Sequence, residues 1–368
     1  MKKAFLFLII AVTIISSGYK TKGLSASAAV AINGDNGEIL YSHNSDIRLP
    51  MASTTKIMTA LVLLENCEDL DAQFVTTKEM VTVEGSSMGL LEGDTVSYRA
   101  LLYGMMLASG NDAANTAAIA IGGSIDGFVK MMNDKAARMG LENTHFVTPS
   151  GLDAEGHYTT AYELALIACE ALKNPDFAEA AAAKSATLSF GNPPYSRSLS
   201  NHNRLLKMYD DVVGVKTGFT KKSGRCLVSA AKRDGKFVIA VTLNDGDDWA
   251  DHRLLLDTGL GAIEVYKYTP DLENISIPVV SGAFYSLDAK ISEVRFSKTK
   301  GSAVTSVICA PKFLYAPVSS GDVIGNAYYY CFDRLVYKSN IISAGVERRK
   351  SSKFNLIFEY FKYMLSQN

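Results

Sequence analysis

The sequence lacks the features of several large classes of protein. Its 37 lysines and arginines nearly balance 38 aspartates and glutamates, so it has no strong basic field of the kind that a general nucleic-acid binder carries. A composition that is 48% hydrophobic and 20% charged, without long apolar runs, excludes a disordered, collagen-like or polytopic membrane protein. At roughly 100 to 200 residues per domain, 368 residues suffice for two domains.

Cysteine and histidine are also scarce, and neither follows a ligand pattern. The five cysteines are odd in number and include no Cys-x-x-Cys, which argues against a zinc site or a disulfide framework. Isolated buried thiols are favoured, although a pair such as Cys309 with Cys331 stays open in an oxidising compartment. We expect no metal and no cofactor, because none of the histidines has metal-ligand spacing. They are His43, His145, His157, His202 and His252.

The N-terminus has the parts of a secretory signal. Lys2 and Lys3 precede an apolar run from Ala4 to Ile15, and small and polar residues follow. A spanning helix needs about 20 apolar residues, so a cleaved leader is favoured over a membrane anchor or a buried helix. We expect an exported protein with residues 1–27 as leader. Its cleavage point stays open among the small residues Ser16, Ser17, Gly18, Ser25, Ala26, Ser27 and Ala28.

The following segment predicts helices enclosed by strands. Apolar runs at 28–33 and 38–42 flank Asn36-Gly37, which tight hairpin turns prefer, and a second hairpin is expected around Asp234-Gly235. Strands at both ends with helices between imply an α/β sandwich of an antiparallel sheet and helices, which we assign to residues 28–266. The helices are expected at 54–64, 101–107, 113–121 and 158–172.

The last part of the chain consists of two segments that differ in composition from the α/β segment and from each other. Segments rich in β-branched residues predict a small all-β domain at 267–345. Residues 346–368 then combine basic residues with an apolar stripe at helical spacing, formed by Phe354, Ile357, Phe358, Phe361, Met364 and Leu365. We expect an amphipathic helix on the outer face of the cytoplasmic membrane. The alternative is a helix packed on the β domain or against another chain.

Three short motifs, each weak alone, occur in an order that one mechanism explains. They are Ser53-Thr54-Thr55-Lys56, Ser109-Gly110-Asn111 and Lys216-Thr217-Gly218. A serine hydroxyl needs a base within hydrogen-bond reach to attack an amide, and residues three apart on a helix share a face, which places Lys56 beside Ser53. A lysine can be that base only if burial or a nearby positive charge lowers its pKa. Lys216 is a candidate for the second charge.

The other motif residues suit the remaining steps of peptide cleavage. Ser109 can relay a proton toward the leaving amine, Asn111 can donate to a substrate carbonyl, and Thr217 can bond to a substrate carboxylate. The main-chain N–H groups of Ser53 and Phe219 are expected to hold the oxyanion, at about 3 kcal/mol per donor. We therefore assign catalysis to Ser53, Lys56 and Ser109, and substrate binding to Asn111, Lys216, Thr217, Gly218 and Phe219, with Gly218 leaving room for substrate along the strand edge.

Such motifs mark β-lactamases and penicillin-binding proteins. The sequence resembles the serine D-Ala-D-Ala carboxypeptidases, the low-molecular-mass penicillin-binding proteins, over about 28–265. The resemblance implies a β-lactamase/transpeptidase-like fold and removal of the terminal D-Ala from peptidoglycan pentapeptide stems. It also implies an acyl-Ser53 intermediate that β-lactams trap as inhibitors. Besides the three motifs it rests on the segments 49–60, 108–114, 148–153 and 211–220.

Two other functions and one departure from the family pattern remain. A β-lactamase shares the acylation residues, but no Glu-x-x-x-Asn occurs between Asn143 and Asp153. A catalytically silent penicillin-binding sensor or scaffold could lose the nucleophile, which is present here. Some family members place an arginine after the strand that follows Lys-Thr-Gly, where this sequence is acidic. Arg253 and Arg225 are the candidates to meet the substrate carboxylate, and Trp249 lies near the expected site.

Overall fold

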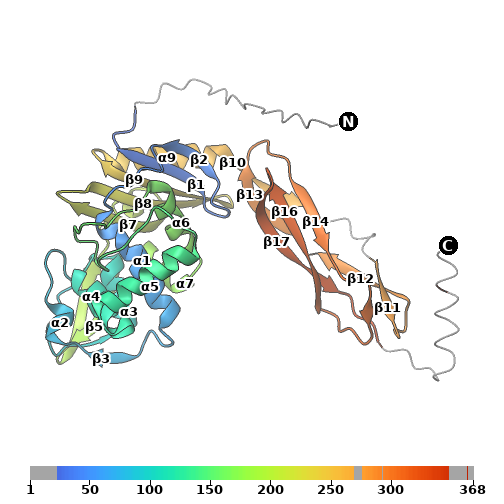
Figure 1. Ribbon diagram of the computed structural model, residues 1–368, viewed down its shortest axis with the longest axis horizontal. Helices are drawn as coiled ribbons and strands as arrows, with labels where there is room; N and C mark the ends of the chain where they lie inside the picture. Colours follow the sequence, from blue (N-terminus) through green and yellow to red (C-terminus); the bar gives the residue numbers. More distant parts are fainter. Residues whose placement is uncertain (1–22, 269–275, 292, 348–362, 364–368) are drawn as a thin grey trace, which may run out of the picture.

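A computed structural model describes residues 23–268, 276–291, 293–347 and 363. Figure 1 shows a larger domain of helices and sheet, from which a narrow all-β domain extends away. Both were expected from the sequence. The predicted C-terminal amphipathic helix lies outside the described residues except for positions 346, 347 and 363, as does most of the predicted leader. No helix within the described ranges is long and apolar enough to cross a membrane.

A five-stranded antiparallel sheet in the order β2-β1-β9-β8-β7 forms the centre of the larger domain. Pairing of β1 with β9 joins the two ends of the domain, as predicted. Both predicted hairpins are confirmed, and Asp234 and Gly235 in the second turn have φ of +54° and +77°, which suits such a turn. The strands are β1 (Ala28–Asn33), β2 (Ile39–His43), β7 (Val212–Thr220), β8 (Gly224–Arg233) and β9 (Lys236–Asp245).

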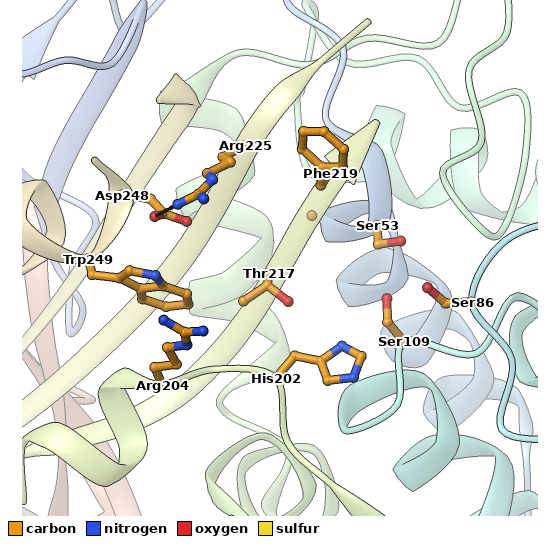
Figure 2. A pocket seen from close by; sticks show the side chains of 11 residues that line it. Ser53, Ser86, Ser109, His202, Arg204, Thr217, Phe219, Arg225, Asp248 and Trp249 are labelled. Carbon is orange, nitrogen blue, oxygen red and sulfur yellow. Dashed lines mark hydrogen bonds and ion pairs between the residues drawn. The ribbon is translucent and has the colours of Figure 1, made fainter. Parts of the chain in front are cut away.

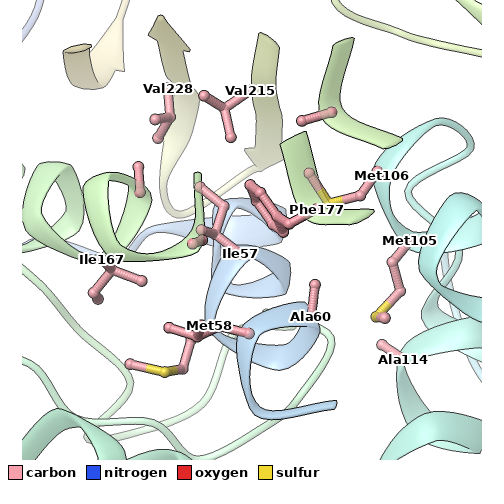
Figure 3. Packing of buried hydrophobic residues seen from close by; sticks show 14 of the residues in the cluster. Ile57, Met58, Ala60, Met105, Met106, Ala114, Ile167, Phe177, Val215 and Val228 are labelled. Carbon is pink, nitrogen blue, oxygen red and sulfur yellow. The ribbon is translucent and has the colours of Figure 1, made fainter. Parts of the chain in front are cut away.

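Helices cover one face of this sheet around a buried helix, α1 (Lys56–Asn66). Figure 3 shows Ile57 of α1 beside Phe177 and on the side of the helix that faces Val215 and Val228, so α1 is fixed to the sheet by apolar contact. The other helices before β7 are α2 (Lys78–Val81), α3 (Tyr98–Met106), α4 (Asn111–Gly122), α5 (Ile125–Arg138), α6 (Ala161–Ala171), α7 (Pro175–Ala182) and α8 (Leu205–Met208).

The opposite face of the sheet is covered by α9 (Asp248–Ala262), which the sequence did not predict. Leu255, Leu256 and Leu260 of α9 belong to a second apolar cluster with residues of β1, β8 and β9. A Cβ at Gly259 would lie 2.6 Å from Val238 Cγ1, so this glycine allows the close approach. Helix α9 was missed because its polar and apolar residues do not separate into two clear faces.

Two further features differ from the sequence prediction. A small sheet in the order β3-β4-β5-β6 was not foreseen, because its strands are short or rich in serine. Helix α6 begins at Ala161 rather than Tyr158, because the Thr160 side chain caps it by accepting from Glu163 N. The strands of the small sheet are β3 (Gln73–Val75), β4 (Thr95–Ser97), β5 (Ser185–Gly191) and β6 (Pro194–Ser200).

The all-β domain begins directly after α9. Its first strand, β10 (Ile263–Tyr268), pairs with β13 (Val294–Thr299), and the six-stranded sheet has the order β14-β16-β17-β12-β11-β15. The last two strands are separated by a turn at Phe332 and Asp333, both with positive φ. The remaining strands are β11 (Ser276–Val280), β12 (Ser286–Ile291), β14 (Thr305–Cys309), β15 (Leu314–Tyr315), β16 (Val323–Cys331) and β17 (Arg334–Ser343).

All five cysteines lie in the described part of the chain, and all are free. The isolated thiols favoured from the sequence are therefore confirmed, and Cys309 and Cys331 do not pair. Three of the thiols are buried as expected, whereas Cys309 is exposed on β14 and Cys67 is half-buried.

Candidate active site

Ser53 lies in a 3-10 turn, η1 (Ala52–Thr55), that leads directly into α1. Ala52, the residue before it, has φ of +48°, a left-handed conformation that is strained for a residue with a Cβ. Strand β7 passes close to this turn: a Cβ at Gly218 would lie 3.0 Å from Met51 O and 3.1 Å from Ser53 N. Gly218 therefore allows β7 to approach the backbone of the serine turn, in addition to the room for substrate that the sequence predicted.

Lys56 is fully buried behind Ser53. Its Nζ lies 3.0 Å from Ser53 Oγ, 2.8 Å from Asn111 Oδ1 and 2.6 Å from Ser150 O. Burial holds the pKa of Lys56 well below its ordinary range, and the charge of Lys216 lowers it further, against the opposing effect of Asp112. A neutral amine held by two other acceptors can direct its lone pair at the Ser53 hydroxyl, which is what a general base requires.

Lys216 approaches the same site from β7. Its Nζ donates to Ser109 Oγ at 3.0 Å and to Thr217 O at 2.9 Å, and burial lowers its pKa to about 7. Ser109 lies in the connection between α3 and α4 and has φ of +57°, a strained backbone conformation in which its hydroxyl accepts from Lys216. A hydroxyl beside a lysine that titrates near neutral pH is suited to passing a proton.

Asn111 holds Lys56 in place. Its Oδ1 accepts from Lys56, and its Nδ2 donates to Glu84 O at 2.5 Å, with the side chain almost fully buried. Glu84 O takes one of the two N–H donors of this amide, and donation of the other to a substrate carbonyl stays a prediction.

The loop that supplies this partner is fixed by Asp112. Its buried carboxylate accepts from Ser87 Oγ at 2.6 Å and from three successive backbone N–H groups, those of Met88, Gly89 and Leu90. Four donors on one carboxylate make a stable junction between the loop and α4. The loop also brings Ser86 to the cavity, which sequence reasoning missed.

The segment Thr148–Asp153 wraps around the serine turn. Gly151 has φ of +84°, and a Cβ there would lie 2.0 Å from Ala52 O, so only glycine fits. His157 supports the turn from behind: its Nδ1 accepts from Val147 N at 2.9 Å, which leaves Nε2 to donate to Thr55 Oγ1 at 2.8 Å. The only sequence signal for these supports was the family resemblance of 148–153.

A cavity of about 410 Å³ opens in front of the two serines. Figure 2 shows Ser53, Ser86 and Ser109 on one side of it and Thr217, Arg204 and Trp249 on the other. Its lining consists of Ser53, Ser86, Ser109, His202, Arg204, Thr217, Gly218, Phe219, Arg225, Asp248 and Trp249. The site therefore unites the three motifs with a group of cationic side chains. Within the described ranges no cluster of three metal-ligating side chains occurs.

The three arginines near the cavity differ in their ion pairs. Arg225, one of two arginines suggested by the sequence, pairs with Asp248 at 3.0 Å. The other, Arg253, is not part of the lining, because Asp211 at 3.2 Å and Asp257 at 2.8 Å hold it. Arg204 was missed, yet it lines the cavity and has no ion-pair partner among the described residues. The only sequence hint was its place just before the Lys-Thr-Gly strand.

Two buried histidines should make the protein less stable in mild acid. Burial lowers the pKa of His157 to about 4 and that of His252 to about 3. Unfolded, both take up a proton near pH 6.5, so below that pH the unfolded state binds more protons. The free energy of unfolding should fall by about 2 kcal/mol per histidine between pH 7 and pH 5, as urea unfolding can measure.

The matched variants are His252→Asn and, as control, His43→Asn at an exposed position. The first should reduce the difference in unfolding free energy between pH 7 and pH 5, and the second should leave it unchanged. A protein equally stable at both pH values would contradict the account.

Comparison with known proteins gives the family. The family described as Peptidase S11, D-alanyl-D-alanine carboxypeptidase, matches residues 16–247. The chain is 39% identical over 230 residues to D-alanyl-D-alanine carboxypeptidase DacF of Bacillus subtilis, a match that covers 61% of this chain and 59% of DacF. It is 29% identical over 367 residues to DacA of Escherichia coli, with 93% and 88% covered.

Comparison with solved structures supports the same family. The DD-transpeptidase of Streptomyces K15 superposes with a TM-score of 0.63 at 33% identity, covering 66% of this chain and all of that one. Penicillin-binding protein 5 of Haemophilus influenzae superposes with a TM-score of 0.66 at 26% identity, covering 90% of this chain and all of that one. With the family match spanning well over half of its length, the chain belongs to the peptidase S11 family of serine-type D-alanyl-D-alanine carboxypeptidases, which are penicillin-binding proteins.

Proposed function

We propose that this chain removes the terminal D-Ala from peptidoglycan pentapeptide stems by way of an acyl-Ser53 intermediate. The observation that carries the proposal is the 3.0 Å contact of the buried Lys56 Nζ with Ser53 Oγ. Ser53 Oγ attacks the carbonyl carbon between the two D-Ala residues, and its proton passes to Lys56. The backbone N–H groups of Ser53 and Phe219 stabilise the oxyanion. Phe219 suits this role because β7 is an edge strand, whose alternate N–H groups face away from β8.

Ser109 and Lys216 complete the cycle. As the C–N bond breaks, the leaving D-Ala amine takes a proton from Ser109 Oγ, which Lys216 replenishes through its 3.0 Å hydrogen bond. Water then attacks the acyl carbon and gives one proton through Ser109 to Lys216. Ser53 Oγ leaves with the proton that Lys56 took up during acylation, which restores the resting protonation of both lysines. β-Lactams acylate Ser53 by the same steps and stay attached.

The substrate carboxylate is assigned to Thr217 and Arg204. Both line the cavity on the side opposite Ser109 (Figure 2). Arg204 is favoured over Arg225 because Asp248 already neutralises the latter. A cation without an ion-pair partner gains more from a carboxylate ligand than one that must first leave its partner.

A β-lactamase is less well supported by the geometry. A class A β-lactamase needs a glutamate carboxylate that activates water against the acyl-enzyme. The one carboxylate among the cavity-lining residues is Asp248, and it pairs with Arg225. A silent sensor is disfavoured because both serine–lysine pairs that catalysis needs are hydrogen-bonded. Lys56 contacts Ser53, and Lys216 contacts Ser109.

The chain is further proposed to act outside the cytoplasm, held at the outer membrane face by residues 346–368. The secretory leader predicted from the N-terminal residues supports export. The described chain leaves the all-β domain beside β11, at the end remote from the peptidase domain (Figure 1). The alternative, a helix on the β domain, has one observation in its favour: the ring of Tyr363 stacks on Tyr285 with centroids 5.4 Å apart.

Replacing Ser53 or Lys56 tests the proposed chemistry. Ser53→Ala should abolish both penicillin labelling and D-Ala release, because among the hydroxyls that line the cavity only that of Ser53 contacts the buried Lys56 amine. Lys56→Met, which keeps the buried volume, should slow acylation by about a hundred- to ten-thousand-fold. Mass spectrometry of the penicillin adduct and release of D-Ala measure these effects. Near-normal acylation of folded Lys56→Met protein would show that another group is the base.

The carboxylate assignment predicts different outcomes for two arginines. Arg204→Gln should reduce kcat/KM for a peptide ending in a free carboxylate by about tenfold or more, since a hydrogen bond to a charged group is worth about 1.5 to 3 kcal/mol. The loss should be much smaller for the same peptide amidated at its C-terminus. Arg225→Gln is the matched control and should have little effect on either peptide. A larger loss for Arg225→Gln would reverse the assignment.

Deleting Phe354–Asn368 tests the membrane proposal. The truncated protein should move from the membrane fraction to the soluble fraction and keep its activity on a small soluble peptide. The variant Tyr285→Ala, which removes the ring partner of Tyr363, should remain with the membrane. Truncated protein that stays on the membrane, or Tyr285→Ala protein that leaves it, would contradict the proposal.

A further inference from the structure

The residues just before β1 are built into the peptidase domain. Ala26 is only 5% exposed and belongs to the second apolar cluster, against which Leu24 also packs. Ser27 N donates to Leu243 O and Asn244 O, both at 3.1 Å, which continues the pairing of β1 with β9 by one residue. The stretch from Leu24 to Ser27 is therefore part of the folded unit.

Ser25 connects this stretch to α9 and the end of β9. Its N donates to Asp251 Oδ2 at 2.6 Å, and its Oγ lies 2.6 Å from Asp245 Oδ1 and 3.0 Å from Asp251 Oδ2. The backbone N of Asp247 donates to Ser25 Oγ at 2.8 Å. Three aspartates thus meet at one serine. We call this group of Ser25, Asp245, Asp247 and Asp251 the Ser25 clasp.

The two carboxylates of the clasp depend on Ser25. Asp245 is 4% exposed and Asp251 is 9% exposed. Burial raises the pKa of Asp245, and the neighbouring charge of Asp251 raises it further, against the opposing effect of the Ser25 hydroxyl. Asp247 N also donates to Asp245 Oδ1 at 3.1 Å, whereas Asp245 Oδ2 has no hydrogen-bond partner among the described residues, so Ser25 is one of few donors to the pair. Loss of Ser25 would leave two buried carboxylates close together with fewer donors, which is costly.

We infer that export processing cuts this chain on the N-terminal side of Leu24, so that the mature protein keeps the Ser25 clasp. Hydrolysis of that peptide bond consumes one water, leaves the new carboxylate on the leader and gives the mature chain its amino group. Of the small residues suggested by the sequence, Ser16, Ser17 and Gly18 remain as possible ends of the leader, and Gly23 is a further one. Cleavage after Ser25 would instead place a charged ammonium on Ala26 inside the apolar cluster, which is unfavourable.

The first test is the mass of the mature protein. This inference rests on the proposed export, so the full chain is produced in a bacterium with a general secretion pathway and the exported protein is analysed by intact mass and N-terminal peptide. A start between residues 17 and 24 supports the inference, and a start at Ser25 or later overturns it. A chain that is never cleaved would refute the export proposal instead, which keeps the two failures apart.

The second test asks whether the clasp stabilises the domain. Protein made without a leader and starting at Leu24 should melt several degrees above protein starting at Ala28 and should be labelled by penicillin at the same rate as the exported form. Ser25→Ala in the Leu24 form should lower Tm by at least about 3 °C, whereas Ser306→Ala at an exposed position on β14 should not change it. Equal Tm for the Leu24 and Ala28 forms would overturn the physical basis of the inference.

Discussion

The burial of Lys56 beside a second buried lysine is the constraint on which the rest of the site depends. An ammonium in an apolar interior is expensive, and a second positive charge nearby makes it more so. The protein therefore favours a neutral Lys56, and a neutral amine is what the Ser53 hydroxyl needs as its proton acceptor. Asn111 and Ser150 supply the acceptors that keep this amine in place. Burying two lysines side by side lowers the stability of the fold, and in return Lys56 can act as a base at neutral pH.

The architecture serves this constraint by bringing four separate segments together. The turn η1 carries the serine and α1, which follows it, carries the lysine. Strand β7 carries Lys216 past the serine turn, and Gly218 allows this close approach. The start of α4 supplies Asn111, and the segment that contains Ser150 closes the site. On the other face of the sheet, α9 contributes Trp249 to the cavity and Asp251 to the chain upstream of β1. One helix thus contacts both the substrate cavity and the proposed mature N-terminus.

The sequence predicted what depends on local pattern and failed where distant segments meet. The hairpins, α1 and the adjacency of Ser53 and Lys56 follow from turn residues and helical periodicity, and all were confirmed. The carbonyl of Ser150 could not be foreseen, because any backbone can supply one and only the fold selects which. From the sequence, Gly218 was explained only by the room it leaves for substrate. Its close approach to Met51 could not be predicted, because that depends on where β7 lies in the fold. Arg253 was suggested by its place after the strand that follows Lys-Thr-Gly, but Asp211 and Asp257 hold it outside the cavity lining. Arg204 was not considered, because nothing in the sequence places it beside Thr217.

The central claim is that Lys56 is a neutral base in the resting protein, and a direct titration of that side chain tests it. Lysine amines can be labelled by reductive ¹³C-methylation and their chemical shifts followed by NMR against pH, with Lys56→Met used to assign the resonance. The account predicts that Lys56 titrates well below the ordinary lysine pKa of 10.5. A Lys56 that titrates at or above 10.5 in the folded protein would contradict it, because the amine would then be charged at every pH at which the protein works.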